Sequence, residues 1–144
     1  MSDAKISIKG LYKIFGTAPE AAMEHVRKGM GKAELNEKHK HVLGLHDINI
    51  EIPEGKLQVI MGLSGSGKST LIRHINRLIE PTAGEVMVDG ENVLGLDQKA
   101  LMEFRRKHMS MVFQKFALLP HRTVIQNATY GLDLMGISKD DAKK

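Results

Sequence analysis

Two segments alternate apolar with polar residues, which is the pattern of β-strands with one face in water. They are residues 5–12 and residues 47–52. Residues 57–61 and 109–113 are short, mostly apolar runs, typical of strands that are covered on both faces. A further strand, residues 86–88, runs into an Asp-Gly pair that favours a tight hairpin turn. The pattern predicts a sheet with an antiparallel part.

Helices are expected in the later part of the chain, where apolar residues recur three and four positions apart. One is predicted to begin near Lys68 and a second after Asp97, which is a suitable N-cap residue. A third is predicted to begin after its cap Thr123, run through Leu134 and end at Gly136. The chain therefore combines predicted strands with predicted helices, which indicates an α/β fold.

Residues 17–42 differ from their surroundings because they are rich in charged and helix-forming residues. Thr17 and Glu20 have the spacing of a capping box, which predicts a helix start. Gly29 and Gly31 then interrupt the helical pattern. This stretch is interpreted as one or two surface helices inserted between strands.

Composition excludes several kinds of chemistry. The chain has 144 residues, no cysteine and 4% aromatic residues, so it has no thiol nucleophile, no thiolate metal site and little material for stacking bases. The net charge of +4 comes from basic residues with acids between them, which is typical of solvated helical faces. The seven histidines, including His39, His41 and His74, lie in polar patterns, and we expect solvated or capping roles for them.

The strongest functional signal is a phosphate-binding loop. Residues 61–70 read Met-Gly-Leu-Ser-Gly-Ser-Gly-Lys-Ser-Thr, with Gly62, Gly67, Lys68 and Ser69 at the required spacing. Glycines let backbone N–H groups approach a polyphosphate closely, and the helix that follows adds free N–H groups and the positive end of its dipole. The lysine supplies a cation for the β and γ phosphates, and the serine hydroxyl is a hard oxygen ligand for Mg²⁺. The sequence therefore predicts a nucleotide triphosphate site.

Two further elements bear on which kind of nucleotide-binding protein the sequence encodes. The guanine-reading Asn-Lys-x-Asp element of GTPases does not occur in the sequence. Asp89 follows an apolar strand, as a Mg²⁺-binding acid would, but Asp-Gly is more simply a hairpin turn.

The order of motifs resembles the ATP-binding subunit of an ABC transporter. After the phosphate loop, residues 109–121 stand where that family has its glutamine loop. Residues 11–16, 60–70 and 76–81 look more narrowly like the glycine betaine/proline importers. The resemblance implies an α/β fold with a P-loop NTPase core and an antiparallel β region. It implies the following organisation: residues 1–144 as the N-terminal part of one nucleotide-binding domain, 17–42 as its charged helical insertion, and 123–144 as the start of its helical subdomain.

The resemblance also implies roles for individual residues. Phe15 matches the aromatic residue that stacks on adenine, and Gln114 matches the residue that completes the Mg²⁺ and water shell. Lys68 and Gln114 are the implied catalytic residues, and Ser69 and Gln114 the implied Mg²⁺ ligands. The implied nucleotide contacts are Phe15, Gly62, Ser64, Gly65, Ser66, Gly67, Lys68, Ser69 and Thr70.

Three family features do not follow in this sequence: the Leu-Ser-Gly-Gly-Gln signature, an apolar strand ending in Asp-Glu, and a switch histidine. Ser138 and Asp141 have the spacing of a new capping box with three residues after it, so we expect a domain cut short at the start of its helical subdomain. Hydrolysis needs a group that orients water beside the γ-phosphate. We therefore expect this chain alone to bind MgATP weakly and to hydrolyse little of it.

The implied parent protein is a cytoplasmic ATPase, peripheral on the inner face of the membrane, that energises import of glycine betaine, proline or a related quaternary amine. Its implied partners are a transmembrane permease subunit, a second copy of the ATPase subunit and, indirectly, a substrate-binding protein; nucleic acid is not expected. Two alternatives use the same loop: a P-loop kinase of a small substrate, and a non-catalytic nucleotide-sensing module.

Overall fold

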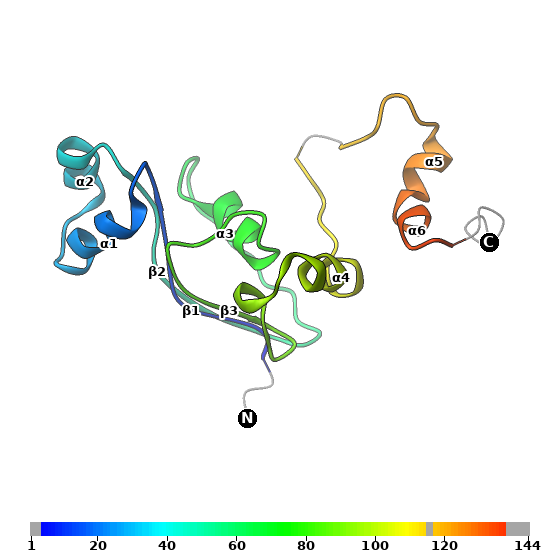
Figure 1. Ribbon diagram of the computed structural model, residues 1–144, viewed down its shortest axis with the longest axis horizontal. Helices are drawn as coiled ribbons and strands as arrows, with labels where there is room; N and C mark the ends of the chain where they lie inside the picture. Colours follow the sequence, from blue (N-terminus) through cyan, green and yellow to red (C-terminus); the bar gives the residue numbers. More distant parts are fainter. Residues whose placement is uncertain (1–3, 115–116, 138–144) are drawn as a thin grey trace. The chain divides into compact units, whose positions relative to one another are not determined.

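The computed structural model describes residues 4–114 and 117–137. The chain divides into two compact units, residues 1–101 and 102–144. The elements follow the chain (Figure 1) in the order β1 (Ala4–Phe15), α1 (Pro19–Arg27), α2 (Lys32–His39), β2 (Val42–Pro53), α3 (Lys68–Ile75), β3 (Ala83–Val88), β4 (Glu91–Asn92), a 3₁₀ turn (Val93–Gly95), α4 (Gln98–His108), α5 (Val124–Ala128) and α6 (Tyr130–Leu134). None of the helices among these residues is long and apolar enough to span a membrane.

The four strands form one antiparallel sheet in the order β2-β1-β3-β4. Ile8 in β1 pairs with Ile50 on one side and with Val86 on the other. Ile8 and Val86 are both fully buried, so the central strands carry the apolar core. The β3–β4 turn has Asp89 and Gly90 at positive φ, as a type I′ hairpin requires. These strands and this hairpin confirm the prediction.

Helices α1 and α2 connect β1 to β2 and lie together at the end of the β1–β2 pair (Figure 1). They are the predicted helices of the insertion. Their apolar side chains form a small core with the neighbouring strands: Ile14, Ala22, Met23, Val26, Leu35 and Leu43. Because α2 buries Leu35 fully against this core, the insertion is packed onto the sheet at this point.

The start of α1 differs from the prediction. The residue that caps α1 is Ala18, with no side-chain cap, so the predicted capping box of Thr17 and Glu20 is wrong. The Ala18 N–H instead donates to Nε2 of His41, at 3.3 Å. Of the solvated or capping roles expected for the histidines, His41 therefore has the second: it is buried, fills the space next to Gly16 and accepts a hydrogen bond at this helix start.

Helix α3 begins at Lys68, as predicted, and is short. Its buried side chains are Leu71 and His74, whereas Ile72 is 43% exposed. The expectation of a solvated or capping role for His74 is wrong, because a residue three positions after Leu71 lies on the same, buried face of the helix. The Nδ1 atom of His74 lies 2.6 Å from the Thr70 carbonyl oxygen.

The two predicted strands with both faces covered are wrong. Residues 57–61 and 109–113 are irregular, and their side chains are largely exposed, with Leu57 at 92% and Val112 at 98%. Such runs become strands when neighbouring parallel strands pair with both of their edges. None of the four strands that the structure describes pairs with either segment.

The remaining helix signals are largely confirmed. The Ala100 N–H donates to Oδ1 of Asp97 at 2.8 Å, so Asp97 is the predicted cap. Thr123 caps α5 in a complete capping box with Gln126. The single helix predicted through Leu134 is broken at Thr129 into α5 and α6. Gly136, at φ 76°, ends the second of these. The predicted capping box of Ser138 and Asp141 lies outside the described residues.

Candidate functional site: a nucleotide cradle

The predicted phosphate loop is a turn that leads directly into α3. Gly65 and Gly67 have φ values of 75° and 96°, which glycine adopts without strain. The Leu71 N–H donates to the Gly67 carbonyl at 2.8 Å, which starts the helical ladder. The N–H groups before it, those of Lys68, Ser69 and Thr70, belong to the first turn and have no partner within the helix. These groups and the helix dipole make the loop suited to an anion.

Lys68 folds back over the loop that precedes it. Its ammonium donates to the carbonyl oxygens of Gly62 at 2.8 Å and Leu63 at 2.7 Å, and lies 3.4 Å from the hydroxyl of Ser66. The lysine therefore holds the two ends of the turn together. The same ammonium is exposed and can turn toward a bound phosphate.

Gly67 lies against strand β2. A Cβ atom at Gly67 would come 2.8 Å from the carbonyl oxygen of Gly44 and 3.1 Å from a methyl group of Leu45. At Gly62 a Cβ atom would come 2.7 Å from Oγ of Ser66. A side chain at Gly67 would thus collide with backbone of β2, whereas one at Gly62 would collide with the Ser66 side chain.

Phe15 is the last residue of β1 and is 40% exposed. Its ring lies against Gly44 of the neighbouring strand, and the ammonium of Lys13 lies 5.2 Å from the ring centre. One hollow of about 240 Å³ joins this ring to the loop. Its lining residues are Phe15, Lys32, Val42, Gly44, Gly65, Gly67, Lys68, Ser69 and Thr70. We call this hollow the Phe15 pocket.

The structure thus brings Phe15 together with Gly65, Gly67, Lys68, Ser69 and Thr70, six of the residues predicted to contact nucleotide. Gly62 and Ser66 lie next to them, through their contacts with Lys68. Ser64 is part of the same turn and is exposed. The site has an aromatic surface at one place and an anion-binding turn at another, as an adenine nucleotide needs.

Gln114 lies in the second unit and is exposed, at the end of the irregular segment 109–113. The role predicted for it beside the phosphate loop stays a prediction. In residues 4–114 and 117–137, no three His, Asp or Glu side chains gather into a metal site. Ser69 is the predicted Mg²⁺ ligand that does line the pocket.

Sequence reasoning missed three residues of the pocket: Lys32, Val42 and Gly44. Val42 and Gly44 precede the predicted strand 47–52, but both lie inside β2, where a glycine is a signal of close backbone approach. Lys32 lies in the insertion, which was assigned no functional role, and its charge is one of many in that segment. Nothing in the sequence pattern distinguishes Lys32 from the other charged residues of the insertion.

Comparison with known proteins decides the family. The family model described as ABC transporter matches residues 45–144. The chain belongs to the ABC transporter family. Within it, the chain is 47% identical over 140 residues to the glycine betaine/proline betaine transport system ATP-binding protein ProV of Salmonella typhimurium. It is 45% identical over 140 residues to the glycine betaine transport ATP-binding protein OpuAA of Bacillus subtilis.

These matches cover 97% of the chain, which spans about a third of the length of both relatives, 35% of ProV and 34% of OpuAA. Among solved structures, a dimeric ATP-binding cassette bound to ADP and Pi in a post-hydrolysis state has a TM-score of 0.75 and 30% identity. This match covers 96% of the chain and 52% of the solved chain. The ABC ATPase-like fold predicted from the motifs is confirmed.

Proposed function

We propose that the chain is the nucleotide-binding front part of an ATPase subunit that energises import of glycine betaine, proline or a related quaternary amine. The observation that carries this proposal is the Phe15 pocket, which combines an exposed aromatic ring with the phosphate loop and the start of α3. The named relatives support the transported class, since their printed names refer to glycine betaine and proline betaine transport.

Within this proposal, each part of the pocket acts on one part of ATP. The ring of Phe15 stacks on the adenine, and the backbone N–H groups of Gly65 to Ser69 surround the phosphates. The ammonium of Lys68 leaves the carbonyls of Gly62 and Leu63 and contacts the terminal phosphates. A cation there balances the negative charge that builds up when the γ-phosphoryl group leaves.

A Mg²⁺ ion fits the chemistry of the donor set. Ser69 supplies a hydroxyl oxygen at the start of α3, and Gln114 an amide oxygen, both of which are hard ligands. Held by these residues, the ion would supply positive charge beside the phosphates. The protein part of its shell is small, because the Phe15 pocket has no carboxylate in its lining, so most of its ligands come from the nucleotide and water.

The domain organisation stays part of the proposal. Residues 17–42 form the charged helical insertion, and residues 123–144 begin the helical subdomain. The partners proposed for the whole subunit are a second copy of itself, a transmembrane permease and, through the permease, a substrate-binding protein. The subunit is proposed to sit peripherally on the cytoplasmic face of the membrane. The alternatives of a P-loop kinase and a sensing module use the same pocket, but the family match favours the transporter.

A chimera tests this function directly. Residues 1–144 replace the matching segment of ProV, and uptake of glycine betaine is measured in cells that lack their own importer. We expect uptake above background, and loss of uptake in the same chimera with Lys68→Ala. A chimera that is produced in normal amounts and binds ATP, yet supports no uptake, would contradict the transport assignment while leaving nucleotide binding in place.

A further inference from the structure

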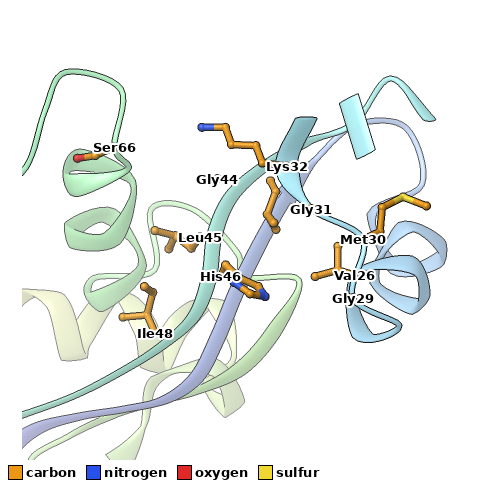
Figure 2. Close-up of a pocket in the computed structure, with 11 residues that line it drawn as sticks. Val26, Gly29, Met30, Gly31, Lys32, Gly44, Leu45, His46, Ile48 and Ser66 are labelled. Carbon is orange, nitrogen blue, oxygen red and sulfur yellow. The ribbon is translucent and has the colours of Figure 1, made fainter. Parts of the chain in front are cut away.

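Lys32 reaches the nucleotide site from outside the motif. It is the first residue of α2, in the insertion, and it lines the Phe15 pocket together with Lys68. It also lines a second hollow of about 420 Å³, between the α1–α2 turn, β2 and Ser66 (Figure 2). In Figure 2 the ammonium of Lys32 points away from the α1–α2 turn, to the side on which Ser66 lies.

The position of Lys32 is fixed by the packing of its helix. Three residues further along α2, Leu35 is fully buried in a core that includes Ile14 and Leu43. Ile14 is the neighbour of Phe15 in β1, and Leu43 is the neighbour of Gly44 in β2. The start of α2 is therefore anchored beside Phe15 and Gly44, two of the strand residues that line the Phe15 pocket.

The charge of Lys32 is available to a ligand. Among the residues that the structure describes, no carboxylate lies within ion-pair distance of its ammonium. The acid nearest to it in α2, Glu34, is bound to Lys38 at 2.6 Å. The Phe15 pocket therefore contains two lysines and no acid, a charge of +2 that suits a polyanion.

We propose that Lys32 is a second phosphate-contacting cation of the nucleotide site, supplied by the insertion and independent of the loop's own Lys68. This proposal rests on the proposed function, because it assumes that the Phe15 pocket binds ATP. Lys32 adds affinity for the charged tail of the nucleotide and none for the base. The insertion thereby contributes to nucleotide binding as well as to packing.

The test compares Lys32→Gln and Lys32→Arg with Lys28→Gln, a matched control. Lys28 is an exposed lysine at the end of α1 in the same insertion, and it does not line the Phe15 pocket. Affinities for ATP, ADP and tripolyphosphate are measured by calorimetry at low and at moderate salt. Because Lys32 is exposed, we expect Lys32→Gln to weaken all three about three- to tenfold at low salt, with a smaller effect at higher salt. Lys32→Arg keeps most of the affinity, and Lys28→Gln changes nothing.

The outcomes separate this inference from the proposed function. If Lys68→Ala weakens ATP binding and Lys32→Gln behaves like Lys28→Gln, the role of Lys32 is wrong and the nucleotide site stands. If Lys32→Gln weakens ATP but leaves tripolyphosphate unchanged, the lysine does not contact phosphate and the inference is also overturned. If the unmodified chain binds none of the three ligands, the proposed function fails, and the role of Lys32 fails with it.

Discussion

The ring of Phe15 occupies the space in which a side chain at Gly44 would begin. A Cβ atom at position 44 would lie 2.7 Å from Cε2 of Phe15, well inside normal contact distance. Gly44 also brings its carbonyl oxygen to the position that forbids a side chain at Gly67. One glycine of β2 thus lies against both the aromatic ring and the phosphate loop, so the two halves of the proposed ATP site pack on the same strand.

Gly44→Ala is therefore expected to displace the ring of Phe15. We predict that ATP affinity falls by about 1 kcal/mol, roughly fivefold, because the stacking surface moves. Tripolyphosphate affinity, measured by the same calorimetry, changes less. Gly95→Ala is the control, since a Cβ atom there meets no atom within 4 Å. Equal affinities of the Gly44→Ala and Gly95→Ala variants for ATP would contradict the link between strand and ring.

Phe15→Ala removes the aromatic surface itself. Stacking of a base on an aromatic side chain is worth about 1–3 kcal/mol, so ATP affinity is expected to fall by that amount. Tripolyphosphate has no base, and its affinity stays unchanged. Phe15→Tyr keeps the ring and is expected to bind ATP normally. A loss of tripolyphosphate binding in Phe15→Ala would mean that Phe15 supports the loop and does not stack on the base.

Gly67→Ala and Gly29→Ala form a matched pair, because both glycines have φ 96°. A methyl group at position 29 meets nothing within 4 Å, whereas at position 67 it meets the Gly44 carbonyl oxygen at 2.8 Å. The left-handed backbone alone costs about 1 kcal/mol in each variant, and the collision adds about 1–3 kcal/mol at Gly67. Chemical denaturation measures the unfolding free energy of each variant. Similar losses of unfolding free energy in the two variants would show that the loop is not packed against β2.

Burial lowers the pKa of the His74 imidazole below its usual 6.5, and the nearby charge of Lys13 adds to this, while a contact with the Thr70 carbonyl opposes it. Because the unfolded chain binds the proton more readily, the stability contributed by neutral His74 is present above pH 6.5. It decreases as the pH falls below that value.

The midpoint of the His74 titration, followed by NMR of the imidazole C–H signals, is therefore predicted to lie below 6.5. The unfolding free energy falls between pH 7.5 and pH 5, and His74→Leu reduces this dependence. His121→Leu, at an exposed histidine, is the control and leaves the pH dependence of the unfolding free energy unchanged. A His74 midpoint at or above 6.5 would contradict the buried, neutral imidazole.

The sequence predicts the loop well because its chemistry is local. The spacing of Gly62, Gly67 and Lys68 determines backbone conformation and charge within nine residues, and the structure contains that turn. Phe15 was assigned by resemblance alone, and its proximity to the loop became visible only once β1 and β2 were paired. Local patterns determine turns and caps, whereas pockets depend on strand pairing.

The predictions that were wrong also concern features that depend on strand pairing and burial. Residues 57–61 and 109–113 have the composition of buried strands, but a strand exists only when a partner supplies its hydrogen bonds. His74 was treated as polar by residue type, although its spacing from Leu71 places it on the buried face. Lys32 could not be distinguished from the other lysines of the insertion, because its significance depends on where Leu35 anchors α2.

Calorimetric titration of MgATP into the unmodified chain and into Lys68→Ala tests the central claim most directly. Hydrogen bonds to charged groups contribute about 1.5–3 kcal/mol, so Lys68→Ala is predicted to weaken binding about ten- to 150-fold. Lys56→Ala, at an exposed lysine outside the pocket, is predicted to bind as the unmodified chain does. Equal affinity of all three proteins for MgATP would contradict the assignment of residues 62–70 as the phosphate-binding cradle.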